Sequence, residues 1–221
     1  MARRPLFQKF SVLISAAIMG VSGAAVVAQP GVPVAPQAPA AAQGQPSAQA
    51  PQGALPLNMR RVELSIDGVA RTVTVDVRES LWEAMVYRLN LSSSNLGCDR
   101  AQCGACTVLV DGRRINSCLA LAVSHDGADI LTIEGVARGD QLHPVQAAFI
   151  AHDGFQCGFC TPGQIMSAIG LIDEGQAGDD PERIREGMSG NLCRCGAYAG
   201  ITEAVLEAQQ NLAATDRRRS A

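Results

Sequence analysis

Residues 97–107 read Gly-Cys-Asp-Arg-Ala-Gln-Cys-Gly-Ala-Cys-Thr, and this stretch decides the fold class of the part of the chain around it. With one later cysteine it forms a first quartet of spacing C-x4-C-x2-C-x11-C: Cys98, Cys103, Cys106 and Cys118. The remaining cysteines form a second quartet of spacing C-x2-C-x32-C-x-C: Cys157, Cys160, Cys193 and Cys195. Because the two quartets use all eight cysteines of the chain, both are candidate sets of metal ligands.

A [2Fe-2S] cluster is held by four cysteine thiolates, and the spacing of the first quartet is typical of plant-type ferredoxins. Zinc also takes four cysteines, but its sites commonly use two short cysteine pairs, whereas three cysteines within nine residues favour the cluster. Two disulfide bridges in an exported protein are the other alternative for the second quartet. We therefore expect two [2Fe-2S] clusters, with a zinc-stabilised or disulfide-bonded binding protein as the alternative of another class.

The residues before the first quartet predict a β-hairpin and a helix. Apolar residues alternate on both sides of a turn at Asp67-Gly68, as in two paired strands. Ser80 and Glu83 have the spacing of a capping box, so a helix is expected to begin at Ser80. Trp82 is expected to pack in or beside the core. A second hairpin turns at Asp111-Gly112, and a last strand is expected at Ile130 to Ile133.

The residues around the second quartet predict helices. Proline at the first turn marks three helix starts, and a fourth helix is expected from Tyr198 to about Leu212. Each cysteine pair of the second quartet lies just before a helix, so two helix N-termini should point at one site and stabilise negative charge there. The quartets leave no place for histidine ligands, and the three histidines are expected in surface or packing roles: His125, His143 and His152. No catalytic constellation stands out.

The N-terminal region has the order of an export signal. Residues 1–28 contain Arg3, Arg4 and Lys9, no acidic residue, and then an uncharged run that ends in small residues. The arginine pair predicts a twin-arginine signal, and folded export would preserve clusters assembled in the cytoplasm. The alternative is an uncleaved membrane anchor. Residues 29–57 hold seven of the eleven prolines with Ala, Gln and Gly, a composition that cannot bury a core and predicts a linker.

Charge argues against nucleic acid as a partner. Without residues 1–28, which hold three of the basic residues, the formal net charge changes from -3 to -6. The only late basic run, Arg217 to Arg219, is short and lies in the expected tail, 214–221. The predicted organisation is α+β: a β-grasp ferredoxin-like domain at 58–136, then an all-α four-helix bundle that binds the second cluster at 137–213.

At this point longer motifs match a known family. They are Gly97-Cys98-Asp99, Gln102 to Thr107, Gln156 to Gly163 and Gly190 to Tyr198. The chain resembles the iron-sulfur subunits of molybdenum hydroxylases, the xanthine oxidase and aldehyde oxidoreductase family, over about Arg60 to Leu212. With its export signal it is most similar to that subunit of a periplasmic aldehyde oxidoreductase. Relatives commonly have glycine where this chain has Ala101, and Thr-Lys where it has residues of Ser94-Asn95-Leu96, which bears on the first cluster's potential and contacts.

The resemblance implies a division of labour. A large partner subunit would hold the molybdenum-molybdopterin cofactor and oxidise the substrate, with no substrate site on this chain. The second quartet would lie near the molybdopterin, where Gln156 and Cys195 match positions that contact the pterin. The first quartet would lie toward an FAD subunit or another acceptor. The expected reaction is oxidation of aldehydes to carboxylic acids in the periplasm, and the alternative is hydroxylation of an N-heterocycle.

Overall fold

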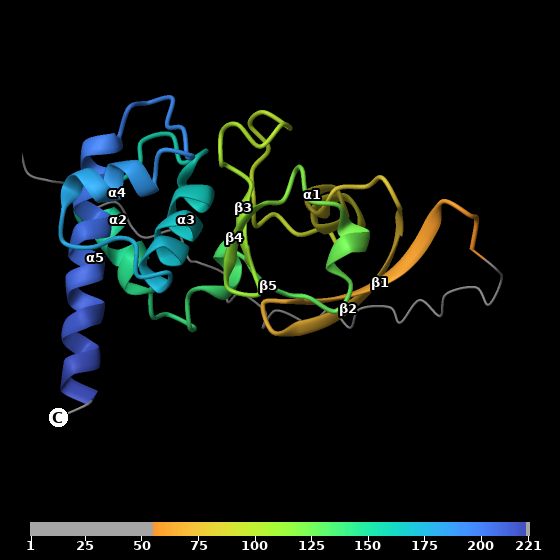
Figure 1. Ribbon diagram of the computed structural model, residues 1–221, viewed down its shortest axis with the longest axis horizontal. Helices are drawn as coiled ribbons and strands as arrows, with labels where there is room; N and C mark the ends of the chain where they lie inside the picture. Colours follow the sequence, from red (N-terminus) through yellow and green to blue (C-terminus); the bar gives the residue numbers. More distant parts are fainter. Residues whose placement is uncertain (1–54, 220–221) are drawn as a thin grey trace, which may run out of the picture. The chain divides into compact units, whose positions relative to one another are not determined.

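The computed structural model describes residues 55–219 (Figure 1). The expected export signal, 1–28, and nearly all of the expected linker, 29–57, lie outside the described residues. Within the described part of the chain, no helix combines the length and apolar character needed to cross a membrane.

Five strands form one mixed sheet in the order β2-β1-β5-β3-β4. Their bounds are β1 Met59–Ile66, β2 Val69–Asp76, β3 Thr107–Val110, β4 Arg113–Asn116 and β5 Asp129–Leu131. Both predicted hairpins are confirmed, with β1 antiparallel to β2 and β3 antiparallel to β4. β5 lies between them, parallel to β1 and antiparallel to β3. The alternating residues Val62, Leu64 and Ile66 are buried on one face of β1, as the period-two pattern requires.

The expected helix at Ser80 begins with its capping box, but it is not a regular α-helix. Ser80 and Glu83 make both bonds of the box, followed by the three-residue α1, Leu81–Glu83. The chain then widens into a π-helix, η1, at Ala84–Arg88, where the Leu89 N–H donates to the Ala84 carbonyl. Leu81 and Met85 are buried against the sheet. Short 3-10 helices flank β5: η2 at Ala122–His125 and η3 at Ile133–Gly135.

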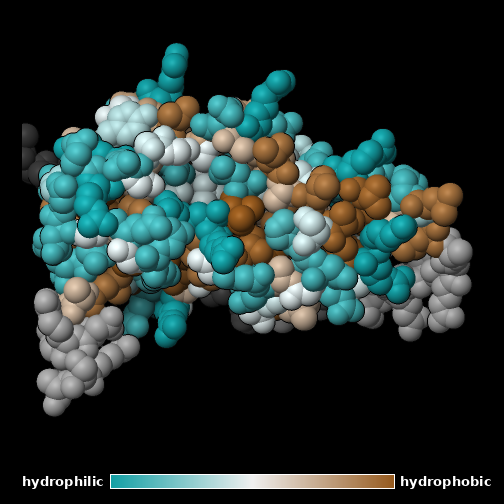
Figure 2. Space-filling view, in the orientation of Figure 1, coloured by the Kyte–Doolittle hydropathy of each residue, from teal (hydrophilic) through white to brown (hydrophobic). Residues whose placement is uncertain are grey.

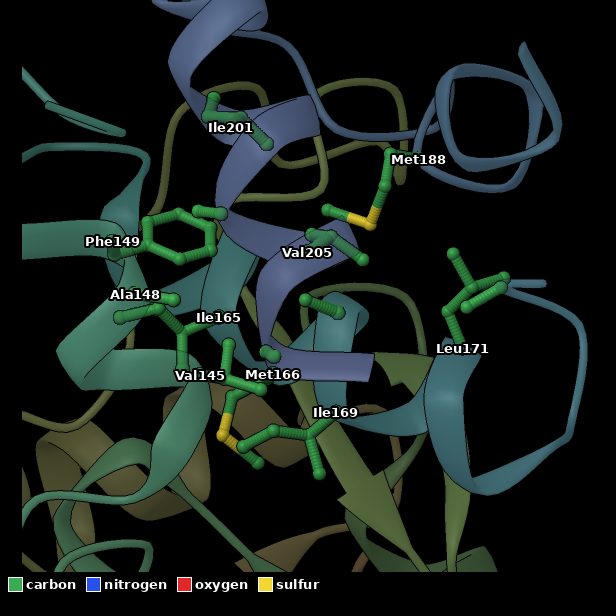
Figure 3. Packing of buried hydrophobic residues seen from close by; sticks show 14 of the residues in the cluster. Val145, Ala148, Phe149, Ile165, Met166, Ile169, Leu171, Met188, Ile201 and Val205 are labelled. Carbon is green, nitrogen blue, oxygen red and sulfur yellow. The ribbon is translucent and has the colours of Figure 1, made fainter. Parts of the chain in front are cut away.

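Four α-helices follow: α2 Pro144–Ala151, α3 Thr161–Asp173, α4 Pro181–Gly187 and α5 Tyr198–Arg219. The three proline-marked starts are confirmed, but α5 continues past Leu212 to Arg219, so most of the expected tail, 214–221, is helical. Phe149 from α2, Met166 from α3 and Val205 from α5 meet in one buried core (Figure 3).

The sheet and the helices share a packed boundary. α3 lies against β3 (Figure 1), and Leu109 of β3 belongs to the core of the helices. Beyond the cores, large hydrophobic side chains reach the surface, and Figure 2 shows such groups between hydrophilic side chains on the half of this face that holds the sheet. The α+β class expected from the sequence is therefore observed.

Candidate [2Fe-2S] sites

The first quartet is presented by an irregular loop between η1 and β3, with Cys118 just after β4. The loop turns back on itself through left-handed residues, with φ of 56° at Asp99 and 52° at Ala101. These turns point main-chain N–H groups inward. Gln102 N donates to Cys98 Sγ at 3.2 Å, and Ala101 N donates to Cys118 Sγ at 3.3 Å. The loop therefore supplies amide donors to sulfur, as a thiolate-bound cluster requires.

The sulfurs of the first quartet lie in two pairs. The thiol of Cys98 lies beside that of Cys103, and the thiol of Cys106 lies beside that of Cys118. Burial acts to raise the pKa of the Cys98 thiol, but main-chain N–H donors, including that of Gln102, outweigh it and lower the pKa to about 7. In the other pair, burial raises the pKa of the Cys106 thiol to about 12. A metal ion would displace this proton on binding.

The second quartet joins the starts of two helices. Cys160 is the N-cap residue of α3, and Ala197 N, immediately before α5, donates to Cys193 Sγ at 3.4 Å. The sulfurs again lie in pairs: Cys157 with Cys195, and Cys160 with Cys193. Burial raises the pKa of the Cys160 thiol to about 12. The expected convergence of the two helix N-termini on one site is therefore observed.

The paired arrangement distinguishes between the candidate metal centres. Among residues 55–219, no three Cys, His, Asp or Glu side chains are placed to hold one metal ion. A structural zinc ion needs four ligands around a single point. A [2Fe-2S] cluster instead takes two protein ligands on each of two irons. Two sulfur pairs in each quartet therefore fit a two-iron centre, with one pair for each iron, and all eight cysteines are free thiols in this structure.

The two quartets open onto a common pocket of about 510 Å³. Its lining includes Gly97 and Cys103 from the first loop and Cys157, Cys160 and Cys193 from the second quartet. The loops are also hydrogen-bonded, since Leu192 N donates to the Cys103 carbonyl at 2.9 Å. The structure thus places the quartets as neighbours, which the sequence alone did not indicate.

The two quartets differ in their exposure to solvent. Cys106 and Cys118 are buried, whereas Cys157, Cys195 and the neighbouring Gln156 are exposed. We call these three exposed residues the rim of the second quartet. The pterin-contacting positions implied by the family resemblance, Gln156 and Cys195, therefore lie where a partner subunit could reach them.

The histidines lie apart from both quartets. His143 caps α2 through its Nδ1, which accepts from Val145 N at 3.2 Å. His152 pairs with Glu207 of α5. His125 bonds within its own 3-10 turn, to the Leu121 carbonyl. These positions agree with the expected packing and surface roles.

Trp82 has a closer relation to the first quartet than its sequence position suggested. It is 8% exposed, as expected for a packing residue, and its neighbours are Cys106 and Cys118. Its Nε1 donates to the Ser94 carbonyl at 3.1 Å, which ties the ring to the segment before the cluster loop. Nothing in the local pattern of residues 80–89 marks this contact, because it depends on how the helix packs against a distant loop.

Family models and relatives agree with this geometry. Residues 64–130 match the 2Fe-2S iron-sulfur cluster binding domain, and residues 132–206 match the [2Fe-2S] binding domain. The iron-sulfur-binding subunit of the Escherichia coli aldehyde oxidoreductase is 52% identical over 159 residues, covering 66% of this chain and 69% of that subunit. The nicotine 6-hydroxylase small subunit of Paenarthrobacter nicotinovorans is 44% identical, covering 69% of this chain and 92% of that subunit.

Solved structures agree as well. A chain of quinoline 2-oxidoreductase from Pseudomonas putida 86 superposes with a TM-score of 0.63 at 38% identity, over 70% of this chain and 98% of that chain. This chain matches the aldehyde oxidoreductase and nicotine 6-hydroxylase subunits at the identities above over most of their length, although the two enzymes are named for different substrates. The chain therefore belongs to the iron-sulfur subunits of the molybdenum hydroxylase family.

Proposed function

We propose that this chain passes electrons from a molybdenum active site on a partner subunit to FAD or another acceptor, during oxidation of aldehydes to carboxylic acids. The observation that carries the proposal is the arrangement of eight sulfurs as two pairs in each of two neighbouring quartets. When bound, each [2Fe-2S] cluster can accept and release one electron. Two such sites in series suit a reaction that delivers electrons in pairs to a carrier that must pass them singly.

The proposed ligands are the complete quartets: Cys98, Cys103, Cys106 and Cys118 for the first cluster, and Cys157, Cys160, Cys193 and Cys195 for the second. Main-chain N–H groups that donate to Cys98, Cys118 and Cys193 would favour the thiolate form and stabilise added negative charge. The fully buried Cys106 would act in the opposite direction, because low local polarity disfavours charge. The balance of these effects sets the potential of each site.

The proposed direction of transfer comes from the family resemblance, and the difference in exposure supports it. We place the molybdopterin of the large subunit beside the rim of the second quartet, with Gln156 and Cys195 toward the pterin. Apolar side chains around this rim support coverage by a partner, since Phe155, Phe159 and Leu192 are 42%, 50% and 52% exposed. The first quartet would then hand electrons to an FAD subunit or another acceptor.

The aldehyde substrate is favoured by the 52% identity to the aldehyde oxidoreductase subunit. The second candidate is hydroxylation of an N-heterocycle, which the 44% identity to a nicotine hydroxylase subunit supports. The substrate would bind to the large subunit in both cases, so the electron-transfer role of this chain is the same.

We further propose that the chain works in the periplasm, exported folded by a twin-arginine signal at 1–28 and tethered by residues 29–57; an uncleaved membrane anchor is the alternative. The proposed domains are 58–136 and 137–213, the second a four-helix bundle. Packing of α2 against α3 and α5, and of α4 against α5, supports the bundle.

Purification of the full chain with its bound partners tests the electron-transfer role. We expect visible absorption and two distinguishable EPR signals from reduced [2Fe-2S] centres, together with molybdenum in the same complex. A colourless zinc protein would end the cluster hypothesis. Aldehydes and N-heterocycles, offered to the complex with an artificial acceptor, distinguish the two substrate classes.

A second experiment tests the export proposal. Replacing both arginines of the pair by lysine, R3K and R4K together, should leave the variant chain in the cytoplasm, while the unchanged chain is recovered in the periplasm. Equal periplasmic recovery of both chains would contradict a twin-arginine signal. Recovery of the unchanged chain with the membrane fraction, after a high-salt wash, would favour the anchor.

A further inference from the structure

Asn191 lies two residues before Cys193, and its side chain is buried between the two cluster loops. The residue is 6% exposed. Its Nδ2 donates to the Gly104 carbonyl at 3.0 Å and to the Gly163 carbonyl at 3.1 Å. Gly104 belongs to the loop of the first quartet, and Gly163 to the first turn of α3, just after Cys160. One side-chain amide therefore joins segments that carry ligands of both quartets.

The position of Asn191 is itself fixed by a buried side chain. Gln164 of α3 is 1% exposed, and its Nε2 donates to the Asn191 main-chain carbonyl at 3.0 Å. The main-chain carbonyl and the side-chain Nδ2 of Asn191 thus both have partners, and rotation of the side-chain amide would leave the buried Nδ2 without its two carbonyl acceptors. Such a loss costs roughly 1–3 kcal/mol per group. Gln164 and Asn191 thus form a small buried hydrogen-bond network at the contact between the two loops.

The segments approach so closely here that neither Gly104 nor Gly163 has room for a side chain. A Cβ on Gly104 would lie 2.5 Å from Asn191 Nδ2 and 2.7 Å from the Gly190 carbonyl oxygen. A Cβ on Gly163 would lie 2.8 Å from Ala105 Cα. Real Cβ atoms essentially never approach other heavy atoms below 3.0 Å, so both positions require glycine for this contact.

Because of this close approach, one main-chain hydrogen bond joins Cys103 of the first quartet to the residue next to Cys193 of the second. Leu192 N donates to the Cys103 carbonyl at 2.9 Å, and Leu192 is bonded directly to Cys193. Asn191 precedes Leu192, so the orientation of its main chain controls whether this bond can form. The side chain of Asn191 and the Leu192 N–H hold the same two loops from adjacent positions.

A separate link joins the sheet and the helices elsewhere. Arg114 of β4 pairs with Glu174 at 2.7 Å, and its Nη1 donates to the Gly187 carbonyl at 2.9 Å. This link can keep the two parts together without fixing the local spacing of the quartets. General cohesion of the fold and the spacing of the quartets can therefore be perturbed separately.

We propose that Asn191 is a positioning residue for electron transfer between the two quartets. Its amide holds the loop of Cys103 against the loop of Cys193 and so maintains the Leu192–Cys103 hydrogen bond. The inference rests on the proposed function, because it requires a cluster in each quartet. In the step concerned, one electron would pass from the cluster held by the second quartet, which would be oxidised, to the cluster held by the first quartet, which would be reduced. No bond is made or broken and no proton moves.

The test measures the magnetic interaction between the two reduced centres in the complete complex by EPR at low temperature. In the unchanged protein we expect mutual splitting or broadening of the two signals. Asn191→Leu, which replaces the amide by a larger hydrocarbon group of the same branching and removes both donors, should reduce or abolish that interaction while both signals keep their integrated intensity. Asn191→Asp keeps the shape and places an acceptor against two carbonyls, so it should act in the same direction.

Two matched controls separate positioning from stability. Asn58→Leu removes an asparagine amide of the sheet part that, within the described residues, has no hydrogen bond to either cluster loop; its Nδ2 donates to Asp76 Oδ2 at 2.7 Å. Arg114→Met removes the separate link between sheet and helices. Both should lower the melting temperature and leave the magnetic interaction unchanged.

Each result has a distinct meaning. Absence of two [2Fe-2S] signals from the unchanged complex contradicts the proposed function rather than the role of Asn191. Two signals in both Asn191 variants with the interaction unchanged overturn the positioning role. Variants that fold without the clusters, or that do not accumulate at all, also overturn it, because Asn191 would then serve assembly instead of spacing.

Discussion

Gly163→Ala gives a sharp test of the contact between the two cluster loops. Gly163 lies in the first turn of α3, where helix propensity alone predicts that alanine stabilises the fold by about 1 kcal/mol. The structure predicts the opposite sign. The new Cβ would lie 2.8 Å from Ala105 Cα and 2.9 Å from its carbonyl carbon, and closer still to the Gly104 carbonyl oxygen. All three are main-chain atoms that cannot move independently of the cluster loop.

The expected cost follows from two effects that exceed the gain in helix propensity. Overpacking of a close contact costs about 1–3 kcal/mol. Separation of the loops would also weaken the bonds that Asn191 Nδ2 donates to Gly104 and Gly163, at about 1–3 kcal/mol for a buried group left without a partner. After subtraction of the helix term, the free energy of unfolding should fall by about 1–5 kcal/mol. For a chain of this size the melting temperature should fall by about 2–20 °C.

Circular dichroism during urea and thermal unfolding measures this change, and Gly190→Ala is the control. Gly190 is an open position, because no atom beyond its chain neighbours lies within 4 Å of the added Cβ. If Gly163→Ala melts at or above the unchanged protein, the loops are not in the contact described and the reasoning fails.

Three further predictions concern the quartets and their surroundings. Cys195→Ser should remove or alter the EPR signal of the second quartet and spare that of the first; loss of both signals from a folded chain would contradict independent sites. Burial lowers the pKa of His143, so the folded state favours the neutral imidazole and the unfolded state binds the proton more readily. Stability from this residue should therefore be complete above its ordinary pKa of about 6.5 and decrease as pH falls below it. His143→Asn keeps a capping side chain and should make the urea midpoint depend less on pH between pH 7 and pH 5.5. If the midpoint changes equally with pH in both proteins, His143 is not the source of the effect. The nearby Asp173 acts with the opposite sign at lower pH, because burial raises its pKa. Ala101→Gly relieves a left-handed residue with φ of 52° and should stabilise the fold by about 0.5–1 kcal/mol, net of added chain entropy; a lower urea midpoint would refute the strain.

The parts of the fold that sequence reasoning predicted are those set by local patterns. Alternating apolar residues about Asp67-Gly68 predicted the first hairpin, and the turn at Asp111-Gly112 predicted the second. The Ser80–Glu83 box predicted the start of the first helix. Proline at N1 likewise marked the starts of α2, α3 and α4. The π-helical continuation at Ala84–Arg88 was not predictable, because no residue type there distinguishes an i+5 hydrogen bond from an i+4 bond.

The cluster sites also combine features that the sequence predicts with features that depend on distant contacts. Counting and spacing identified both quartets, since ligand number is a property of the sequence. The pairing of Cys106 with Cys118, and of Cys157 with Cys195, depends on how distant segments fold together. The proposed role of Asn191 was not predictable either, because its position in the motif near Cys193 does not indicate that its partners are Gly104 and Gly163.

Ala101 connects the sequence comparison to the electrostatics of the first quartet. The family resemblance implies glycine at this position, and the left-handed backbone of residue 101 is one that glycine adopts without strain. The strained residue persists in this chain because its N–H donates to Cys118 Sγ, a sulfur in a buried pair with few other donors. Relaxing the turn to ordinary φ would turn this N–H away from the sulfur and leave buried negative charge without its hydrogen bond. The strain and the hydrogen bond therefore both follow from one backbone geometry. Residue 101 stays in that geometry, whichever side chain it carries, because the buried sulfur needs the N–H donor.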